Sequence, residues 1–413
     1  PRWPATLLAL LSVVLAAAGV VIAVRRRAWL LPALVGAVVV AAIPVLKVGA
    51  PWIDAKVLSL TAPVVLAAAA AAVVSAGGPG WWRAAATVTG LVLAAGCLAS
   101  SWLVARDVYI APRSELVELR ALGDQLDGKG PTLVLNYEGY GTRYYLGPAD
   151  DEGVSELRYN QIPSRDGNTF PNFATAEVDD IDQQALFSYP VIVRRRTPVG
   201  SRPPSGYRTV HAGRFFEAWQ RDRSPLPADH ISLGDALAPA AKLTCTQARV
   251  AAAKASTLTA APSVNPVLVA LTAGRMPVGW FDGTNVRPRS DGDATVPVTL
   301  PQAGDWRVWV GGGVLGKLTV RVDGKAVGSY RHQLDASVGW LRFGAKRLGA
   351  GRHTVTLAYS RGWGAGRGSD DGQLPLGPVA LSLEDQPALV RVPASGVRRL
   401  CDGRTYDWLE TFK

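Results

Sequence analysis

Three tryptophans in the C-terminal half of the chain have the type and setting to bind a sugar, because an indole offers a flat apolar face with one polar edge. Trp306 and Trp309 lie three residues apart in an expected strand, so their side chains point to opposite faces and one of them is expected to be exposed. Trp363 lies in a Gly-rich loop where no strand would bury it. Core packing is the alternative for the first two indoles, and a loop anchor is the alternative for Trp363.

Two acidic pairs could bind a cation. Asp291 and Asp293 flank a glycine, and Asp370 and Asp371 are adjacent, so either pair could supply carboxylate oxygens to a structural Ca²⁺. Acidic residues beside glycine are also typical of ordinary turns. Ca²⁺ is therefore the one metal that the sequence suggests, and plain turns are the alternative.

Lys47 and Lys56 bracket a short segment between two apolar stretches. At a membrane surface such a pair could contact the phosphate of a lipid-linked sugar as point charges. The alternative is that the two side chains extend from the ends of membrane-spanning helices into water.

The chain has three cysteines. Cys97 lies in an apolar stretch and is expected to be a packing residue. Cys245 and Cys401 lie in the polar part of the chain, where an oxidising compartment would favour a disulfide between them. That bridge would fasten the C-terminal tail to the region before the last domain.

No catalytic residue can be assigned from the sequence. We find no convincing carboxylate pair for glycoside hydrolysis, no Ser-His-Asp set and no CxxC pair. The Gly-rich segment 362–368 follows an expected strand instead of opening a helix, which argues against a nucleotide site. The formal net charge of +11 is spread over a region of mixed sign, so we expect no nucleic-acid partner.

The residues above must be positioned by two very different parts of the chain. Residues 1–105 hold almost no charge and form four long apolar stretches, each able to cross a bilayer as a helix of about 20 residues. Buried helices of a soluble core rarely lack charge over such lengths. The four expected transmembrane helices are 3–24, 28–46, 57–82 and 84–105.

The orientation of these helices follows from the short loops between them. Arg25, Arg26, Arg27 and Arg83 mark the cytoplasmic side, because cytoplasmic loops carry an excess of Lys and Arg. Everything after residue 105 is then extracytoplasmic, and the protein is expected to be a multi-pass protein of the cell membrane.

The extracytoplasmic part is expected to hold two domains and a tail. Residues 106–236 alternate helical and strand patterns around a hairpin at Ala212-Gly213, which favours a small α/β domain. An Ala-rich helical linker is expected over 237–262. A β-sandwich of the jelly-roll type is expected over 263–390, followed by the tail 391–413. The expected sandwich strands are 294–300, 305–310, 317–322, 340–343, 353–360 and 378–383.

The sandwich resembles carbohydrate-binding jelly-roll modules. Three segments carry the resemblance: a strand that enters through Gly304-Asp305-Trp306, a hairpin at Val322-Asp323-Gly324, and a strand that begins at Gly351-Arg352-His353. The resemblance implies that this domain binds a glycan. These motifs are shared by many sandwiches, since Gly and Asp suit tight antiparallel turns.

As a whole the chain resembles the C-terminal part of actinobacterial polytopic glycosyltransferases of the GT-C type. The resemblance implies a polyprenyl-phosphate sugar as donor and cell-envelope polysaccharide as acceptor. In that family the acidic catalytic loop lies near the N-terminus, and no such loop occurs in this sequence. Because the chain starts at Pro1 without Met, we expect its four helices to be the last of a longer set.

Two other functions stay open. A non-enzymatic, membrane-anchored envelope protein could use the same domains to bind polysaccharide or to scaffold a partner. Half of a transporter is less favoured, since transport paths usually place polar residues at the midplane of the membrane. The expected partners are thus the lipid bilayer together with polysaccharide or a lipid-linked sugar.

Overall fold

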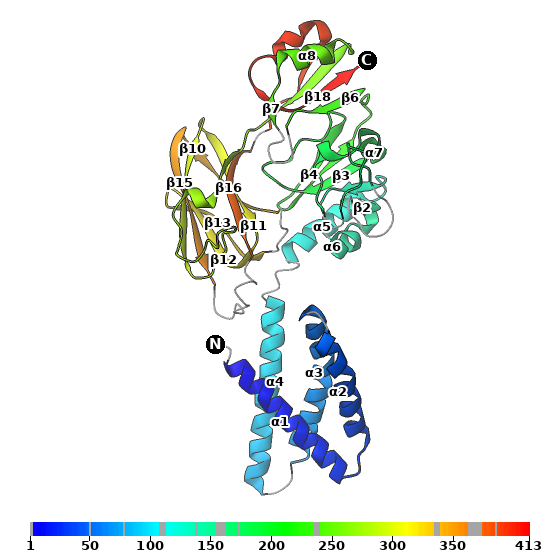
Figure 1. Ribbon diagram of the computed structural model, residues 1–413, viewed down its shortest axis with the longest axis vertical. Helices are drawn as coiled ribbons and strands as arrows, with labels where there is room; N and C mark the ends of the chain where they lie inside the picture. The colour runs from blue at the N-terminus through cyan, green and yellow to red at the C-terminus, as the bar shows by residue number, and fades with distance from the viewer. Residues whose placement is uncertain are drawn as a thin grey trace. The chain divides into compact units, whose positions relative to one another are not determined.

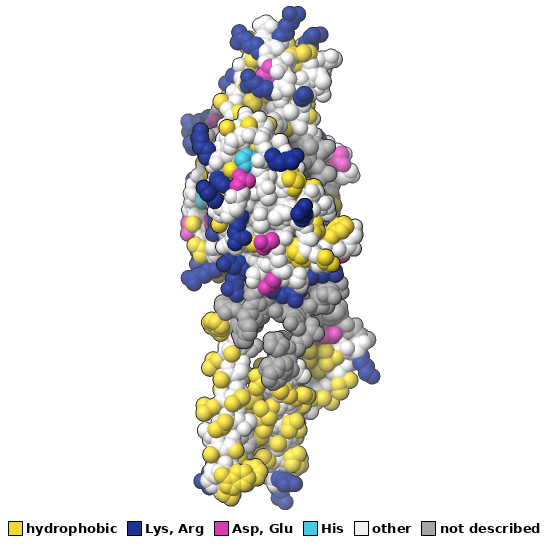
Figure 2. All heavy atoms as spheres, turned by 90° about the vertical axis from the view of Figure 1, so that its left-hand side faces the viewer, with side chains coloured by type: hydrophobic (Ala, Val, Ile, Leu, Met, Phe, Trp, Pro, Cys, Tyr) yellow, Lys and Arg dark blue, Asp and Glu magenta, His cyan; other side chains and the backbone are white. Residues whose placement is uncertain are grey.

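A computed structural model describes residues 3–48, 51–76, 79–106, 113–136, 139–153, 162–171, 174–234, 240–333, 339–361, 374–384 and 386–413. The chain divides into two compact units, Pro1–Asp107 and Val108–Lys413 (Figure 1). On the face drawn in Figure 2, apolar side chains cover the helical first unit, whereas most Lys and Arg side chains lie on the second.

The first unit consists of four helices that are long and apolar enough to cross a membrane. The predicted third span is wrong at its C-terminal end, because Trp82 belongs to α4. The turn before α4 contains Pro79, whose ring cannot continue a helix. The helices are α1 Trp3–Arg25, α2 Leu30–Val48, α3 Pro51–Val74 and α4 Gly80–Arg106.

Small residues let α1 and α3 pack closely. Ala16 of α1 is buried together with Ala68 and Ala69 of α3. A Cβ atom added at Gly19 would lie 2.0 Å from the carbonyl oxygen of Ala68. Small residues are typical of helix contacts in which the backbones approach closely. Gly19 is therefore required by the packing of this helix pair.

We predict that Gly19→Leu destabilises the first unit by about 2 kcal/mol, because the new side chain would overpack the contact. Thermal unfolding of the full chain in detergent would measure the effect. Gly36→Leu is the matched control, since a Cβ atom at Gly36 in α2 would meet nothing within 4 Å. Equal unfolding temperatures for the two variants would contradict the prediction.

The second unit begins with a five-stranded sheet in the order β2-β1-β3-β5-β4. Strand β1 pairs in parallel with β2 and β3, and the hairpin β4-β5 extends the sheet with antiparallel strands. The strands are β1 Thr132–Val134, β2 Asp151–Gly153, β3 Val191–Arg195, β4 Tyr207–Ala212 and β5 Phe216–Arg221.

Helical segments cover both faces of this sheet. Leucines of α5 (Arg113–Leu126) share a buried cluster with Val191 and Val193. Leu186 of α7 (Gln183–Ser188) packs in a second cluster with Ile192, which points to the opposite face because side chains alternate along a strand. This is the α/β arrangement that the sequence predicts. The remaining helical pieces are α6 Gly139–Tyr145, η1 Gly147–Ala149 and η2 Val178–Asp180.

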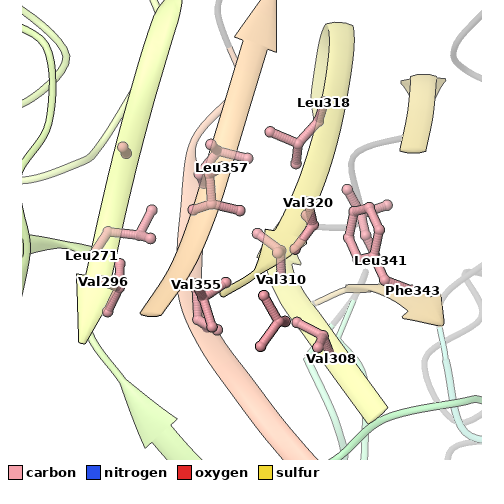
Figure 3. Packing of buried hydrophobic residues seen from close by; sticks show 14 of the residues in the cluster. Leu271, Val296, Val308, Val310, Leu318, Val320, Leu341, Phe343, Val355 and Leu357 are labelled. Atoms are coloured by element: carbon pink, nitrogen blue, oxygen red, sulfur yellow. The ribbon is translucent and has the colours of Figure 1, made fainter. Parts of the chain in front are cut away.

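Two four-stranded sheets follow, in the orders β10-β15-β12-β13 and β14-β11-β16-β9. Their inner faces enclose the largest buried cluster, part of which is drawn in Figure 3. Asp323 and Gly324 join β12 to β13 with positive φ angles of 50° and 77°, as a tight hairpin requires. The strands are β9 Val267–Val269, β10 Gly292–Leu300, β11 Gly304–Gly312, β12 Val314–Val322, β13 Lys325–Gln333, β14 Trp340–Leu348, β15 Gly351–Ser360 and β16 Leu376–Leu383.

The prediction of a helical linker over 237–262 is wrong. Among its described residues, 240–262, α8 (Cys245–Ala252) is the helix, and β8 (Thr257–Pro262) lies inside a further sheet in the order β17-β8-β18-β6. The predicted tail supplies two strands of the same sheet. Ala has no strong strand preference, but pairing with the distant β18 overrides its local tendency. The remaining elements are β6 Asp229–Ser232, β7 Ala241–Lys242, η3 Leu271–Ala273, β17 Val390–Pro393, η5 Ala394–Leu400 and β18 Thr405–Phe412.

The predicted disulfide between Cys245 and Cys401 is confirmed. It joins the first residue of α8 to the residue that follows η5, with the two Cα atoms 5.3 Å apart. The bridge therefore links segments that are 156 residues apart in sequence and that cover the same sheet.

We predict that the double variant Cys245→Ser/Cys401→Ser loses about 2–4 kcal/mol of stability, because a bridge across a long loop restricts the unfolded chain. Chemical denaturation of the full chain would measure the loss, and Cys97→Ser is the control. Thiol labelling before reduction should modify only Cys97. Labelling of Cys245 or Cys401 in the unreduced protein would contradict the disulfide.

Candidate functional site

A cleft of about 430 Å³ opens at the carboxyl ends of β1 and β3. The chain leaves β1 for β2 on one side and returns to β3 on the other, and such a reversal of strand order is a common place for ligands. Asn136 follows β1, and Arg196 and Thr197 follow β3. The cleft is completed by residues of the sandwich, including Trp340 and the segment Gly377-Pro378.

Glycines form the wall of the cleft on the sandwich side. Cβ atoms built on Gly311 and Gly377 would each lie close to the backbone of the other, at 3.2 and 3.1 Å. Gly312 has a φ of 83°, and a Cβ there would meet the carbonyl oxygen of Pro375 at 2.1 Å. The register of β11 against β16 shifts at this point. Glycine is thus needed where the two backbones approach at the edge of the cleft.

Trp340 is the aromatic residue among the described residues that line this cleft. It is the first residue of β14, where it pairs with Gly311 and is half-buried. Gly312 donates a backbone hydrogen bond of 2.8 Å to Gly339, which precedes the indole in the chain. The position of Trp340 is therefore held by the backbone of two sheet strands.

A buried guanidinium forms the floor of the cleft. Arg194 is 4% exposed, donates to Glu217 at 2.7 Å and to the carbonyl of Ser201 at 2.6 Å, and lies over the Trp219 ring. Burial lowers the pKa of Arg194, but the charges of Glu217 and Glu177 outweigh it and hold the pKa above its ordinary value. Arg194 is therefore a fixed positive charge under the cleft.

Glu177 and Asp180 are the two carboxyl groups among the described residues that line the cleft. The side chain of Glu177 is 22% exposed and lies 3.5 Å from Arg194. Burial raises its pKa to about 7, with Arg194 opposing and the charges of Asp179 and Asp180 reinforcing the shift. Its Oε2 atom has no hydrogen-bond partner within the described part of the chain. Glu177 can therefore exchange a proton near neutral pH, as an acid–base group or as a hydrogen bond donor to a ligand.

We predict that Glu177→Gln raises the free energy of unfolding at pH 8 by about 3 kcal/mol and leaves it unchanged at pH 4. The folded pKa of about 7 lies above the ordinary value of 4.5, so the folded protein binds the extra proton and loses stability as pH rises between these values. Denaturant titrations at the two pH values would test this. An equal effect at both would show that the carboxyl group titrates normally.

Next to the cleft lies a charged cluster that sequence reasoning missed. His230 of β6 is 2.9 Å from Asp179 of η2 and 3.0 Å from Glu410 of β18, and all three side chains are buried. Burial lowers the pKa of His230, but the hydrogen bonds to the two carboxylates outweigh it and raise the pKa. The three residues are far apart in sequence, and no local motif signals their meeting. The cluster ties the C-terminal strand to the segment that carries Glu177.

Trp306 and Trp309 are not exposed, and the prediction that one of them faces solvent is wrong. Their residues are 1% and 3% exposed. They do point to opposite faces of β11, but both faces are covered. Trp306 lies in the sandwich core, whereas Trp309 donates to Ser382 at 2.9 Å and lies under the guanidinium of Arg342. Neither indole can bind a glycan in this structure.

The other predicted binding residues are not tested. Trp363, Asp370 and Asp371 lie outside the described residues. Asp291 and Asp293 are exposed, and Asp291 accepts the backbone N–H of Arg361 at 2.8 Å. The described residues contain no group of three or more His, Cys, Asp or Glu that could hold a metal ion. A Ca²⁺ site therefore stays a prediction.

Lys47 and Lys56 do not lie in a loop, because both belong to helices. Lys47 is in the last turn of α2, and Lys56 follows the first turn of α3. Both side chains are exposed, and each residue lies at the end of an apolar segment. Their contact with a lipid phosphate stays a prediction.

No protein-family model matches the chain, and no curated protein matches it. Matching solved structures include a family 35 carbohydrate-binding module from an environmental isolate, with 14% identity over 33% of this chain and 96% of that one and a TM-score of 0.19. The CBM36-1 domain of a multidomain xylanase from the hindgut metagenome of Trinervitermes trinervoides has 11% identity over 29% and 99%, with a TM-score of 0.21.

A ruminal GH26 endo-beta-1,4-mannanase also matches, with 15% identity over 24% of this chain and a TM-score of 0.18. The matched part spans only 19% of the length of that mannanase. The structural neighbours of the chain thus include carbohydrate-binding modules.

Proposed function

We propose that this protein is anchored in a membrane by its four apolar helices and binds a saccharide in the cleft at the carboxyl ends of β1 and β3. The observation that carries the proposal is the convergence of one half-buried indole, Trp340, with an amide and a titratable carboxyl group, Asn136 and Glu177. Small-molecule sites combine an apolar surface with a few placed polar groups in this way.

The polar groups suit a ligand rich in hydroxyl groups. The Oδ1 atom of Asn136 accepts the backbone N–H of Arg195, so the amide is anchored and still has N–H donors. Glu177 accepts hydrogen bonds when ionised and donates one when protonated. A sugar ring could stack on Trp340 while its hydroxyl groups exchange hydrogen bonds with these two side chains.

Membrane anchoring is supported by the length and composition of α1–α4, each of which contains an apolar segment of 18 residues or more. The Cys245–Cys401 disulfide fits an oxidising compartment, which supports an extracytoplasmic location for the second unit. The arginines at Arg25–Arg27 and Arg83 support the same orientation.

Saccharide binding would serve either of two roles. In a GT-C-type glycosyltransferase with a polyprenyl-phosphate sugar donor, the cleft would hold the cell-envelope polysaccharide that accepts the sugar. In a non-enzymatic envelope protein it would attach the chain to polysaccharide. We assign no transfer step to the described residues, so binding is the function that we propose for this chain.

We predict that Trp340→Ala weakens saccharide binding by about tenfold, corresponding to about 1.4 kcal/mol of lost stacking. The full chain in detergent would be probed on a glycan array and then by titration with the best ligand. Phe281→Ala is the control, because Phe281 is a 46% exposed aromatic residue that does not line the cleft.

Unchanged binding by Trp340→Ala, or equal losses in the two variants, would remove the cleft as the saccharide site. Trp363→Ala on the same array tests the Gly-rich loop independently. A loss confined to that variant would move the site to the loop.

A further inference from the structure

Beside the main cleft lies a small recess of about 10 Å³ that is rich in arginine. Arg195 and Arg196 of the α/β domain and Trp340 of the sandwich line both the recess and the cleft. Arg214, Arg342 and the carboxylate-bearing Glu115 also line the recess, together with apolar and aromatic residues. A volume of this size holds about one water-sized atom.

The carboxylates nearest the recess are already engaged by other groups. Glu115 pairs with Arg195. Glu384 receives two hydrogen bonds from Arg307, while Arg342 approaches it only to 3.5 Å. The carboxylate of Glu118 accepts the backbone N–H groups of Arg214, Phe215 and Phe216. Arg342 therefore shares Glu384 with Arg307, and Glu118 is already engaged by three backbone groups.

The guanidinium of Arg214 lies over an aromatic ring that also lines the recess. The guanidinium lies 4.6 Å from the centroid of Tyr330, and its Nε donates to the Tyr330 hydroxyl at 3.2 Å. That hydroxyl in turn donates to the backbone carbonyl of Arg342 at 2.7 Å. Tyr330 thus contacts the guanidinium of Arg214 and the backbone of Arg342, and its neutral phenol compensates neither charge.

The lack of compensating negative charge in the recess is clearest at Arg342. Its Nε is buried and has no hydrogen-bond partner among the residues that the structure describes. Burial lowers its pKa to about 10, and the like charges of Arg196 and Arg307 add to the effect. A buried cation is costly unless an anion and hydrogen bonds compensate it.

We propose that this recess binds one oxygen of an anionic group on the saccharide in the cleft, so that the ligand is an acidic saccharide bearing a carboxylate or a phosphate. The inference rests on the proposed function, because it assigns a chemical class to the ligand of the same cleft. Arginine suits this task, since its planar fork matches both anions.

The experiment compares glucose with glucuronate and with glucose 1-phosphate, using the full chain in detergent and titration calorimetry at low salt. Glucose and glucuronate differ by one carboxylate, and glucose 1-phosphate adds a phosphate to the same ring. We expect at least one acidic sugar to bind about tenfold more tightly than glucose, which corresponds to one charge-assisted hydrogen bond. The advantage should shrink as ionic strength rises.

Arg342→Gln should reduce binding of the acidic sugar about tenfold and leave glucose binding within about twofold. Arg214→Gln should do the same, and because this side chain is exposed the variant should fold normally. Arg347→Gln is the matched control: it lies on the same strand, is 81% exposed and does not line the recess.

Equal affinity for the three sugars, or equal losses in Arg342→Gln, Arg214→Gln and Arg347→Gln, would overturn the acidic ligand while saccharide binding itself stands. Inorganic phosphate is titrated alone to separate anion binding in the recess from saccharide binding in the cleft. Binding of phosphate that is lost in Arg214→Gln, without binding of any sugar, would support the anion site and overturn the proposed function. No binding of sugar or phosphate would overturn both.

Discussion

The buried guanidinium of Arg194 is the constraint on which the cleft depends. A cation in this position must be paired, and it is paired with Glu217 on the neighbouring strand and with Glu177 across the cleft. A Cβ atom on Gly200 would lie 2.5 Å from the Arg194 Nη1 atom. The loop after β3 therefore packs closely against the guanidinium and needs glycine at this position. Burial raises the pKa of Glu177 to about 7 although the Arg194 charge lowers it, and the charges of Asp179 and Asp180 add to the rise.

Other buried charges hold the C-terminal sheet to the α/β domain. His230 bridges Asp179 and Glu410, and Glu410 also accepts the backbone N–H of Ser205 at 3.0 Å. Trp408 of β18 donates to the carbonyl of Arg202 at 2.7 Å. Buried polar networks of this kind favour one arrangement, because any slip leaves a charge unpaired. They fix η2, and with it the position of Glu177 on one side of the cleft.

The sandwich contributes a buried core and one edge of the cleft. Its core is continuous across two sheets, so the edge formed by β14 and the bulge of β11 is held firmly (Figure 3). That edge carries Trp340 and Arg342 two residues apart on β14, and alternation points them to the same side of the strand. The indole that we propose for a sugar ring and the guanidinium that we propose for an anion thus lie on a single strand.

The sequence alone determined the features that depend on local pattern. The apolar stretches predicted four long helices, the strand and turn signals predicted the sandwich and its Asp323-Gly324 hairpin, and two distant cysteines predicted the disulfide. Tertiary structure alone decided which indole is accessible, because burial of Trp306 and Trp309 depends on what covers each face of β11. Tertiary structure also decided which residues line the cleft and which carboxylates pair with His230. Both sets come from segments far apart in the sequence, and no local pattern signals their contact. Long-range strand pairing likewise turned the Ala-rich segment before Pro262 into a strand.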